Sequence, residues 1–167
     1  MSVSSSSRFR SSKALLLGCL LGVAAAAVLG GLASRGAPVF YAQLARPSWA
    51  PPAGVFGPVW SLLYTLMAVA AWLVAREPAA PGRRWALGLF VAQLAANALW
   101  SWLFFAWRDG RLAFVDVLLL LALVALTAWR FWRVRPLAGL LLLPYLAWVG
   151  FASVLTWAVW QGNPQLL

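Results

Sequence analysis

The sequence predicts an all-α membrane protein, a bundle of five transmembrane helices in a single domain. Of its 167 residues, 64% are hydrophobic and 10% are charged, whereas soluble domains average roughly 45–50% apolar and about 25% charged residues. The apolar residues form five long runs, at 14–33, 55–75, 85–107, 112–132 and 137–160. Each run is long enough to cross a hydrocarbon core of about 30 Å as a helix. None shows the alternation of a membrane-barrel strand, so we expect helices throughout.

The first run, 14–33, follows a basic, Ser-rich N-terminal tail at 1–13. The motif LLGC that ends at Cys19 resembles the cleavage site of a lipoprotein signal peptide. About fourteen apolar residues follow that cysteine, however, so a spanning helix is the favoured interpretation. Small residues recur at every fourth position of this helix: Gly18, Gly22, Ala26 and Gly30. They would allow close approach to another helix, either in the same monomer or in a second subunit.

The loop at 34–54 is expected to act as a preformed lid over one end of the bundle. Its later part and the start of the next run contain four prolines within twelve residues: Pro47, Pro51, Pro52 and Pro58. Proline fixes its own φ angle and lowers the entropy that a loop loses on ordering. The loop can therefore hold Trp49 over the mouth of a pocket, and Tyr41 lies in the same loop.

The second, third and fifth runs place aromatic and polar residues at helical spacing. Residues three or four apart share a helix face, which gives the stripes Trp60–Tyr64–Met67, Gln93–Asn97–Trp100–Phe104 and Tyr145–Trp148–Ala152–Thr156. Each stripe alone would be typical of ordinary helix packing. All three, however, reach the same half of the bilayer as the lid. Together they predict a pocket for a planar, apolar ligand with a few polar groups.

Two further residues are unusual for their position in a membrane. Asp116 lies four residues into the fourth run, where a carboxyl group is costly unless it is paired or faces a polar cavity. Pairing with Arg108 or Arg111, protonation, and a place at the edge of the pocket all remain open. Pro144 lies within the fifth run and is expected to kink that helix, freeing the carbonyl of Leu140.

The distribution of positive charge predicts the orientation. With the N-terminus on one side, that side carries nine Lys and Arg residues and the other side carries four. The positive-inside rule therefore predicts a cytoplasmic N-terminus. We expect the protein to lie in the bacterial inner membrane, and the outer membrane is the alternative location. The net charge of +10 lies at the helix ends, which indicates contacts with lipid headgroups rather than with nucleic acid.

The chain lacks the residues that most conventional enzymatic chemistry needs. The chain has no histidine, one cysteine and three acidic residues, Glu77, Asp109 and Asp116. Histidine general bases and histidine-ligated metals or haem are therefore excluded, and one cysteine cannot form an internal disulfide. We expect no catalytic acid–base residues, no metal site and no cofactor.

The segments PSWAPPAGVFGPVWSLLYTLMAVAAWLV, ANALWSWLFF, LAFVDVLLL and LAGLLLLPYLAWVGFASVLTWAVWQGNP resemble, in this order, the conserved blocks of one family. This is the TspO/MBR family of tryptophan-rich sensory proteins and translocator proteins (peripheral-type benzodiazepine receptors). The resemblance covers about residues 40–164. It implies a five-helix bundle, often a homodimer, with a cavity that binds porphyrins and, in animal members, cholesterol and benzodiazepine-type ligands. The chain departs from the family at 155–157, where many members have LNY and this sequence has LTW.

Combining the residues and the resemblance, we expect a set of ten ligand-binding residues: Tyr41, Trp49, Trp60, Tyr64, Asn97, Trp100, Asp116, Tyr145, Trp148 and Ala152. The favoured function is binding of a porphyrin-like tetrapyrrole such as protoporphyrin IX for sensing, regulation or transport. Sterol-like and benzodiazepine-type molecules are further candidate ligands, and membrane lipids and a second copy of the chain are expected partners. Light-dependent oxidative porphyrin degradation, which would use Trp60 and Trp148, is one alternative. A scaffold or export component without a ligand is another.

Overall fold

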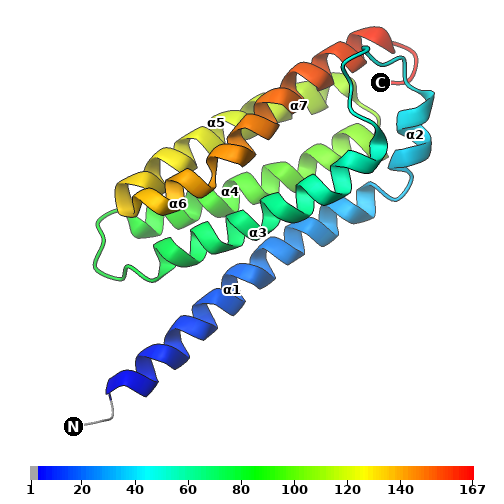
Figure 1. Cartoon of the computed structure of the whole chain (residues 1–167). Helices are drawn as coiled ribbons and strands as arrows, with labels where there is room; N and C mark the ends of the chain where they lie inside the picture. Colours follow the sequence, from blue (N-terminus) through cyan, green and yellow to red (C-terminus); the bar gives the residue numbers. More distant parts are fainter. Residues whose placement is uncertain (1–3) are drawn as a thin grey trace.

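The computed structural model describes residues 4–167, with side chains from residue 13 onward, and every regular element in this range is helical. The chain forms α1 (Ser4–Ala33), α2 (Ala37–Gln43), α3 (Phe56–Ala75), α4 (Arg83–Ser101) and α5 (Gly110–Val134), followed by α6 (Pro136–Leu141) and α7 (Leu143–Gly162) (Figure 1). A short 3₁₀ turn, Ala53–Val55, precedes α3, and a π-helical segment, Trp102–Ala106, follows α4.

Five helical stretches are long and apolar enough to cross a membrane. They are Lys13–Ala33, Ala53–Ala75, Arg83–Ala106, Gly110–Val134 and Pro136–Gly162. Each coincides with one of the predicted runs to within a few residues. The predicted five-helix transmembrane bundle is confirmed, and the protein is a multi-pass membrane protein.

The first helix begins earlier than its apolar run does. α1 starts at Ser4 and continues through most of the predicted tail. Residues 4–13 contain neither proline nor glycine, so nothing interrupts the helix where the apolar residues begin. An apolar run marks the part of a helix that lies in lipid, and the helix itself can extend beyond it into water.

The lid contains a helix that the sequence did not indicate. α2 has a proline in its first turn, Pro38, and it buries Phe40 and Tyr41 against the end of the bundle. Proline is well suited to the first helical turn because that position needs no N–H bond. At seven residues, α2 is too short for a convincing periodic pattern, and its stability comes from the packing of these two rings.

The third and fifth spans are both irregular. At the end of the third span, the N–H of Trp107 donates to the carbonyl of Trp102 at 2.8 Å, an i→i+5 bond of the π type. The fifth span is interrupted at Leu142, between α6 and α7. Pro144 lies in the first turn of α7, where its missing N–H leaves no bond unmade. The irregularity predicted for Pro144 is therefore present, with the break two residues earlier.

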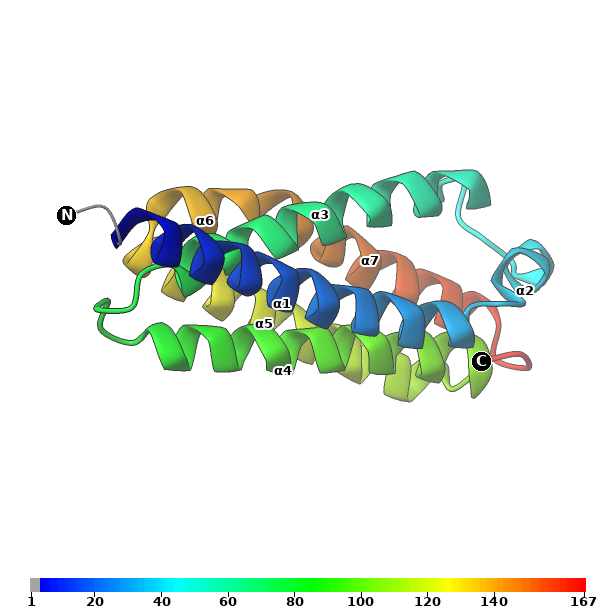
Figure 2. The same cartoon turned by 90° about the horizontal axis from the view of Figure 1, so that it is seen from below.

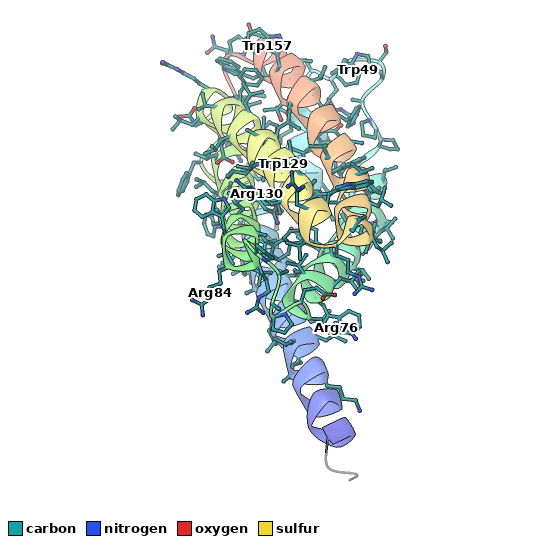
Figure 3. The ribbon with its side chains drawn as sticks, turned by 90° about the vertical axis from the view of Figure 1, so that its left-hand side faces the viewer. Trp49, Arg76, Arg84, Trp129, Arg130 and Trp157 are labelled. Carbon is teal, nitrogen blue, oxygen red and sulfur yellow. The ribbon has the colours of Figure 1, made fainter. Side chains whose placement is uncertain are left out.

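The two ends of the bundle differ. The α3–α4 loop and the α5–α6 turn lie at the end nearer the N-terminus, whereas α2 and the C-terminus lie together at the opposite end (Figures 1 and 2). Figure 3 shows Trp49 and Trp157 toward the α2 end, and Arg76 and Arg84 toward the other. We call these the lid end and the basic end.

The small-residue stripe of α1 is used in two ways. α1 packs against α3 and α4, and Ala26 and Gly30 are buried there. A Cβ atom added to Gly30 would lie 3.2 Å from Oγ of Ser101, whereas Gly18 and Gly22 have no atom within 4 Å of such a Cβ. The later half of the stripe thus serves packing within the monomer, and the earlier half is open.

Candidate functional site

A cavity of about 410 Å³ lies under the lid, between the long helices α1, α3, α4, α5 and α7. Its volume falls within the range of small-molecule sites, roughly 300–1,000 Å³. α1 contributes Gly30 and Ser34, and α2 contributes Tyr41. The remaining wall comes from the start of α3, the end of α4 with its π-helical segment, Val117 and Leu120 of α5, and α7 from Trp148 to Val159.

Aromatic rings form most of this wall. On α3, the rings of Trp60 and Tyr64 lie 5.3 Å apart. On the α4 side, Trp100 and Phe104 stack at 5.1 Å with an interplanar angle of 14°. On the α7 side, Trp148 is 5.6 Å from Phe151 and 5.9 Å from Phe56. These rings are positioned by contacts with one another, which favours a preformed site over one that collapses without a ligand.

The polar groups of the cavity are few and uncharged. Tyr64 donates from its hydroxyl to Oδ1 of Asn97 at 2.9 Å, joining α3 to α4 across the wall. Ser34, Ser101 and Thr156 are the other side chains with hydroxyl groups in the lining apart from Tyr41. No charged side chain is among the cavity-lining residues in the described part of the chain. The site is therefore suited to an apolar body with one or two hydrogen-bonding groups.

Tyr41 of α2 roofs the cavity. Its hydroxyl donates to the carbonyl of Pro51 at 3.0 Å, and its ring meets Phe56 edge-on at 5.5 Å. The guanidinium of Arg46 lies 4.7 Å from the centre of the same ring. The contacts with Pro51 and Arg46 tie α2 to the proline-rich part of the lid, and the contact with Phe56 ties it to the start of α3.

The structure brings seven of the ten predicted site residues together around the cavity. These are Tyr41, Trp60, Tyr64, Asn97, Trp100, Trp148 and Ala152. Trp49, Asp116 and Tyr145 do not line it. The helical stripes in the sequence thus locate the wall of the cavity. They do not separate the residues on its inner face from those in the layer behind it.

Trp49 and Tyr145 lie on opposite sides of this wall. Trp49 is 48% exposed and meets Phe151 edge-on at 5.8 Å from outside. Tyr145 is fully buried behind Trp60, with ring centres 6.1 Å apart, and its hydroxyl donates to Oε1 of Gln93 at 2.9 Å. Both residues support rings of the wall rather than presenting their own.

Asp116 is buried next to the cavity. It is 5% exposed, and neither carboxyl oxygen has a hydrogen-bond partner in the part of the chain whose side chains are described. Its neighbour Val117 lines the cavity. Pairing with Arg108 or Arg111 was one of the three alternatives, and the structure shows no such pair. The ion pair found within residues 13–167 joins Arg135 to Glu77 at the basic end instead.

The sequence reasoning missed several lining residues. The missed residues are Phe56, Phe105, Phe151, Leu155 and four small residues at the end of α1, namely Ala27, Gly30, Gly31 and Ser34. Phe151 and Leu155 continue the helical stripe of Trp148 on α7, so an extended stripe would have found them. The α1 residues are small and carry no aromatic signal, and only the packing of α1 against α4 reveals them. At the departure from the family pattern, Leu155 and Thr156 face the cavity, whereas Trp157 is 46% exposed and packs against Phe114.

A family model and several known proteins match this chain, and all of them point to one family. The model of the TspO/MBR family matches residues 18–161. The chain is 42% identical to the human "Translocator protein" over 126 residues, which is 74% of this chain and 75% of that protein. It is 39% identical to the "Tryptophan-rich protein TspO" of Chlorobaculum tepidum over 132 residues, covering 75% and 80% of the two chains. A third relative, the "Tryptophan-rich sensory protein" of Cereibacter sphaeroides, is 37% identical over 124 residues, covering 74% and 77%.

The family match spans all five membrane helices and every element around the cavity. This chain therefore belongs to the TspO/MBR family.

Proposed function

We propose that this protein binds a porphyrin-like tetrapyrrole in the cavity under its lid. The supporting observation is the lining itself: large flat rings on three sides and no charged group. A planar macrocycle can stack on Trp60, Trp100 and Trp148, while Tyr64 and Asn97 hydrogen-bond with polar atoms of the ligand.

The absence of charge from the lining also sets the orientation of such a ligand. Carboxylates would lose their hydration among these rings at a large cost in free energy. The propionates of a porphyrin therefore stay at the lid end, where Arg46 lies on the ring of Tyr41 and Arg108 on the ring of Phe40. Guanidinium groups are suitable partners for carboxylates.

In the cell, ligand binding serves sensing, regulation or transport. The names of the relatives contain both "sensory" and "translocator". A site near one membrane surface is suited to sensing and to transport alike. We place the N-terminus and the basic end in the cytoplasm of a bacterial cell, because more Lys and Arg residues lie on that side. The open half of the α1 stripe, at Gly18 and Gly22, is the face we assign to a homodimer.

Titration of the purified protein with protoporphyrin IX in the dark, followed by tryptophan quenching, tests this proposal. Trp60→Ala and Trp148→Ala each remove a ring from the wall, so we expect at least about tenfold weaker binding from each. Trp85→Ala is the matched control, since Trp85 is 59% exposed at the basic end. Equal and unsaturable quenching in all four proteins would show partition into detergent and would remove the site.

The same complexes test the other candidate ligands. A sterol-like or benzodiazepine-type molecule that uses this cavity displaces protoporphyrin IX competitively. Displacement should then weaken in parallel with porphyrin binding in the two cavity variants and should persist in the Trp85→Ala control.

A second candidate function is light-dependent oxidative breakdown of the bound porphyrin. Trp60 and Trp148 both line the cavity, so two oxidisable indoles would flank the ligand, and light and oxygen would be co-reactants. Illumination of the complexes with and without oxygen distinguishes this function from binding alone. Product that forms only with light and oxygen, and is lost in both cavity variants, supports the enzymatic function. Equal bleaching in the Trp60→Ala, Trp148→Ala and Trp85→Ala proteins contradicts it.

A further inference from the structure

Asn163, one residue past the end of α7, makes three hydrogen bonds with its side chain. Its Oδ1 accepts from the N–H of Ala45 at 2.8 Å. Its Nδ2 donates to the carbonyl of Ala45 at 2.9 Å and to the carbonyl of Val159 at 2.7 Å. The residue is only 7% exposed. One amide thus pairs with both backbone groups of a residue 118 positions away.

The side-chain amide of Asn163 connects the end of α2 with a residue of the cavity wall. Ala45 lies just after Leu44, the C-cap of α2, and Val159 lines the cavity. The backbones also approach closely here, because a Cβ atom added to Gly162 would lie 3.4 Å from the Ala45 carbonyl oxygen. Asn163 therefore adds a hydrogen-bonded link between the lid and the wall of the cavity to the packing of Phe40 and Tyr41 against the bundle.

A second attachment lies a few residues further along the lid, at Pro51, whose carbonyl accepts from Tyr41. Between the two attachments, residues 46–50 form a short arch. The N–H of Ala50 donates to the carbonyl of Pro47 at 3.0 Å, and Trp49 rests on Phe151, which lines the cavity. We call residues 46–50 the arch.

We propose that Asn163 is a positioning residue that holds the lid closed and thereby sets how long a ligand stays in the cavity. With both attachments made, opening is confined to the arch, and Trp49 leaves Phe151 while α2 stays in place. Without Asn163, α2 and the arch move together, and the cavity opens more often. The effect of Asn163 on the residence time of a ligand rests on the proposed function, whereas the attachment of the lid by Asn163 does not.

The test compares Asn163→Leu and Asn163→Ser with the wild-type protein. Leucine has a similar volume and no polar group, and serine is too short to pair with both groups of Ala45. Gln161→Leu is the matched control, because Gln161 is exposed at the same helix end. The first measurement is hydrogen exchange of the ligand-free protein. We expect the amide of Ala45 to exchange at least about tenfold faster in both Asn163 variants, with the middle of α3, α4 and α5 unchanged.

The second measurement is dissociation of protoporphyrin IX into excess empty vesicles, followed by fluorescence. We expect dissociation to be roughly tenfold faster in both variants and association to change less, since changes at one interface mostly affect the off-rate. Unchanged exchange at Ala45, or faster exchange with unchanged dissociation, would overturn the proposal. Loss of protection throughout the bundle in both variants would also overturn it, because Asn163 would then hold the fold rather than the lid.

These measurements separate failure of the two proposals. A wild-type protein that does not bind protoporphyrin IX contradicts the proposed function, while the exchange rate of Ala45 still decides whether Asn163 anchors the lid.

Discussion

The hydroxyl of Tyr64 donates a hydrogen bond of 2.9 Å to Oδ1 of Asn97, and both residues line the cavity. The bond joins α3 to α4 within the membrane-spanning part of the bundle. It makes this pair both a structural contact and the main polar feature of the site.

Removing either partner should lower the free energy of unfolding by less than the burial of the pair suggests. Hydrogen bonds between membrane helices average about 0.6 kcal/mol in double-mutant cycles and reach about 1.7 kcal/mol. We expect a coupling energy in this range between Tyr64→Phe and Asn97→Leu. The free energy of unfolding of the two single variants and the double variant, from denaturation in mixed micelles, measures it. Thr65→Val is the control, because the hydroxyl of the exposed Thr65 bonds only within its own helix. Additive single variants would mean that the bond contributes nothing.

Helix α6 should not tolerate a larger residue at Gly139, where it packs against the end of α5. A Cβ atom added there would lie 2.8–2.9 Å from Cβ, Cα and N of Trp132, two of which are backbone atoms that cannot move freely. We expect Gly139→Ala to lower the free energy of unfolding by about 1–3 kcal/mol. Gly88→Ala is the matched control, because Gly88 lies on α4 with no atom within 4 Å of an added Cβ. There, alanine should stabilise the helix by roughly 0.5–1 kcal/mol. Equal effects of the two substitutions would contradict the close contact at Gly139.

The ion pair at the basic end should contribute little to stability. Nη1 of Arg135 lies 2.8 Å from Oε1 of Glu77, but the two side chains are 41% and 39% exposed. Exposed pairs contribute about 0.2–1 kcal/mol and are weakened by salt. We therefore expect Glu77→Gln to lower the melting temperature only slightly at low salt and not at all in 1 M NaCl. A large loss that persists in high salt would show that the pair has a further structural role.

The two aspartates of the lid end should respond in opposite ways. Oδ1 of Asp109 accepts from the N–H of Leu112 at 2.8 Å and so caps α5. We expect Asp109→Ala to destabilise the protein by about 1 kcal/mol, as the loss of a helix cap does.

Asp116 has no hydrogen-bond partner within the described side chains, so Asp116→Asn removes no bond while it removes any cost of a buried charge. We expect the unfolding free energy of this variant to be unchanged or higher. Thermal unfolding of Asp116→Asn beside Asp109→Ala measures both effects. A loss of several kcal/mol in Asp116→Asn would mean that the carboxyl is bound to a group such as a buried water or a cation.

Helical periodicity in the sequence identified side chains that line the cavity, and their role in ligand binding stays a prediction. Trp60 with Tyr64, Asn97 with Trp100, and Trp148 with Ala152 were placed on common faces at one depth, and all six line the cavity. Tyr145 lies on the same stripe as Trp148 but donates to Gln93 behind the wall and does not line the cavity. Spacing along a helix cannot tell which edge of a stripe faces the cavity, since that depends on how the helix is rotated against its neighbours.

The sequence by itself determined the solvent, the number of spans and the end of the bundle at which the site lies. These properties follow from apolar length and from periodicity within single helices, which are local and leave direct marks in the residue order. Only the tertiary structure decided that α1 supplies part of the cavity wall, that Asp116 pairs with neither Arg108 nor Arg111, and that Asn163 joins the lid to α7. Such contacts join residues far apart in the chain, and they depend on the crossing of helices and the path of loops, which local patterns do not encode.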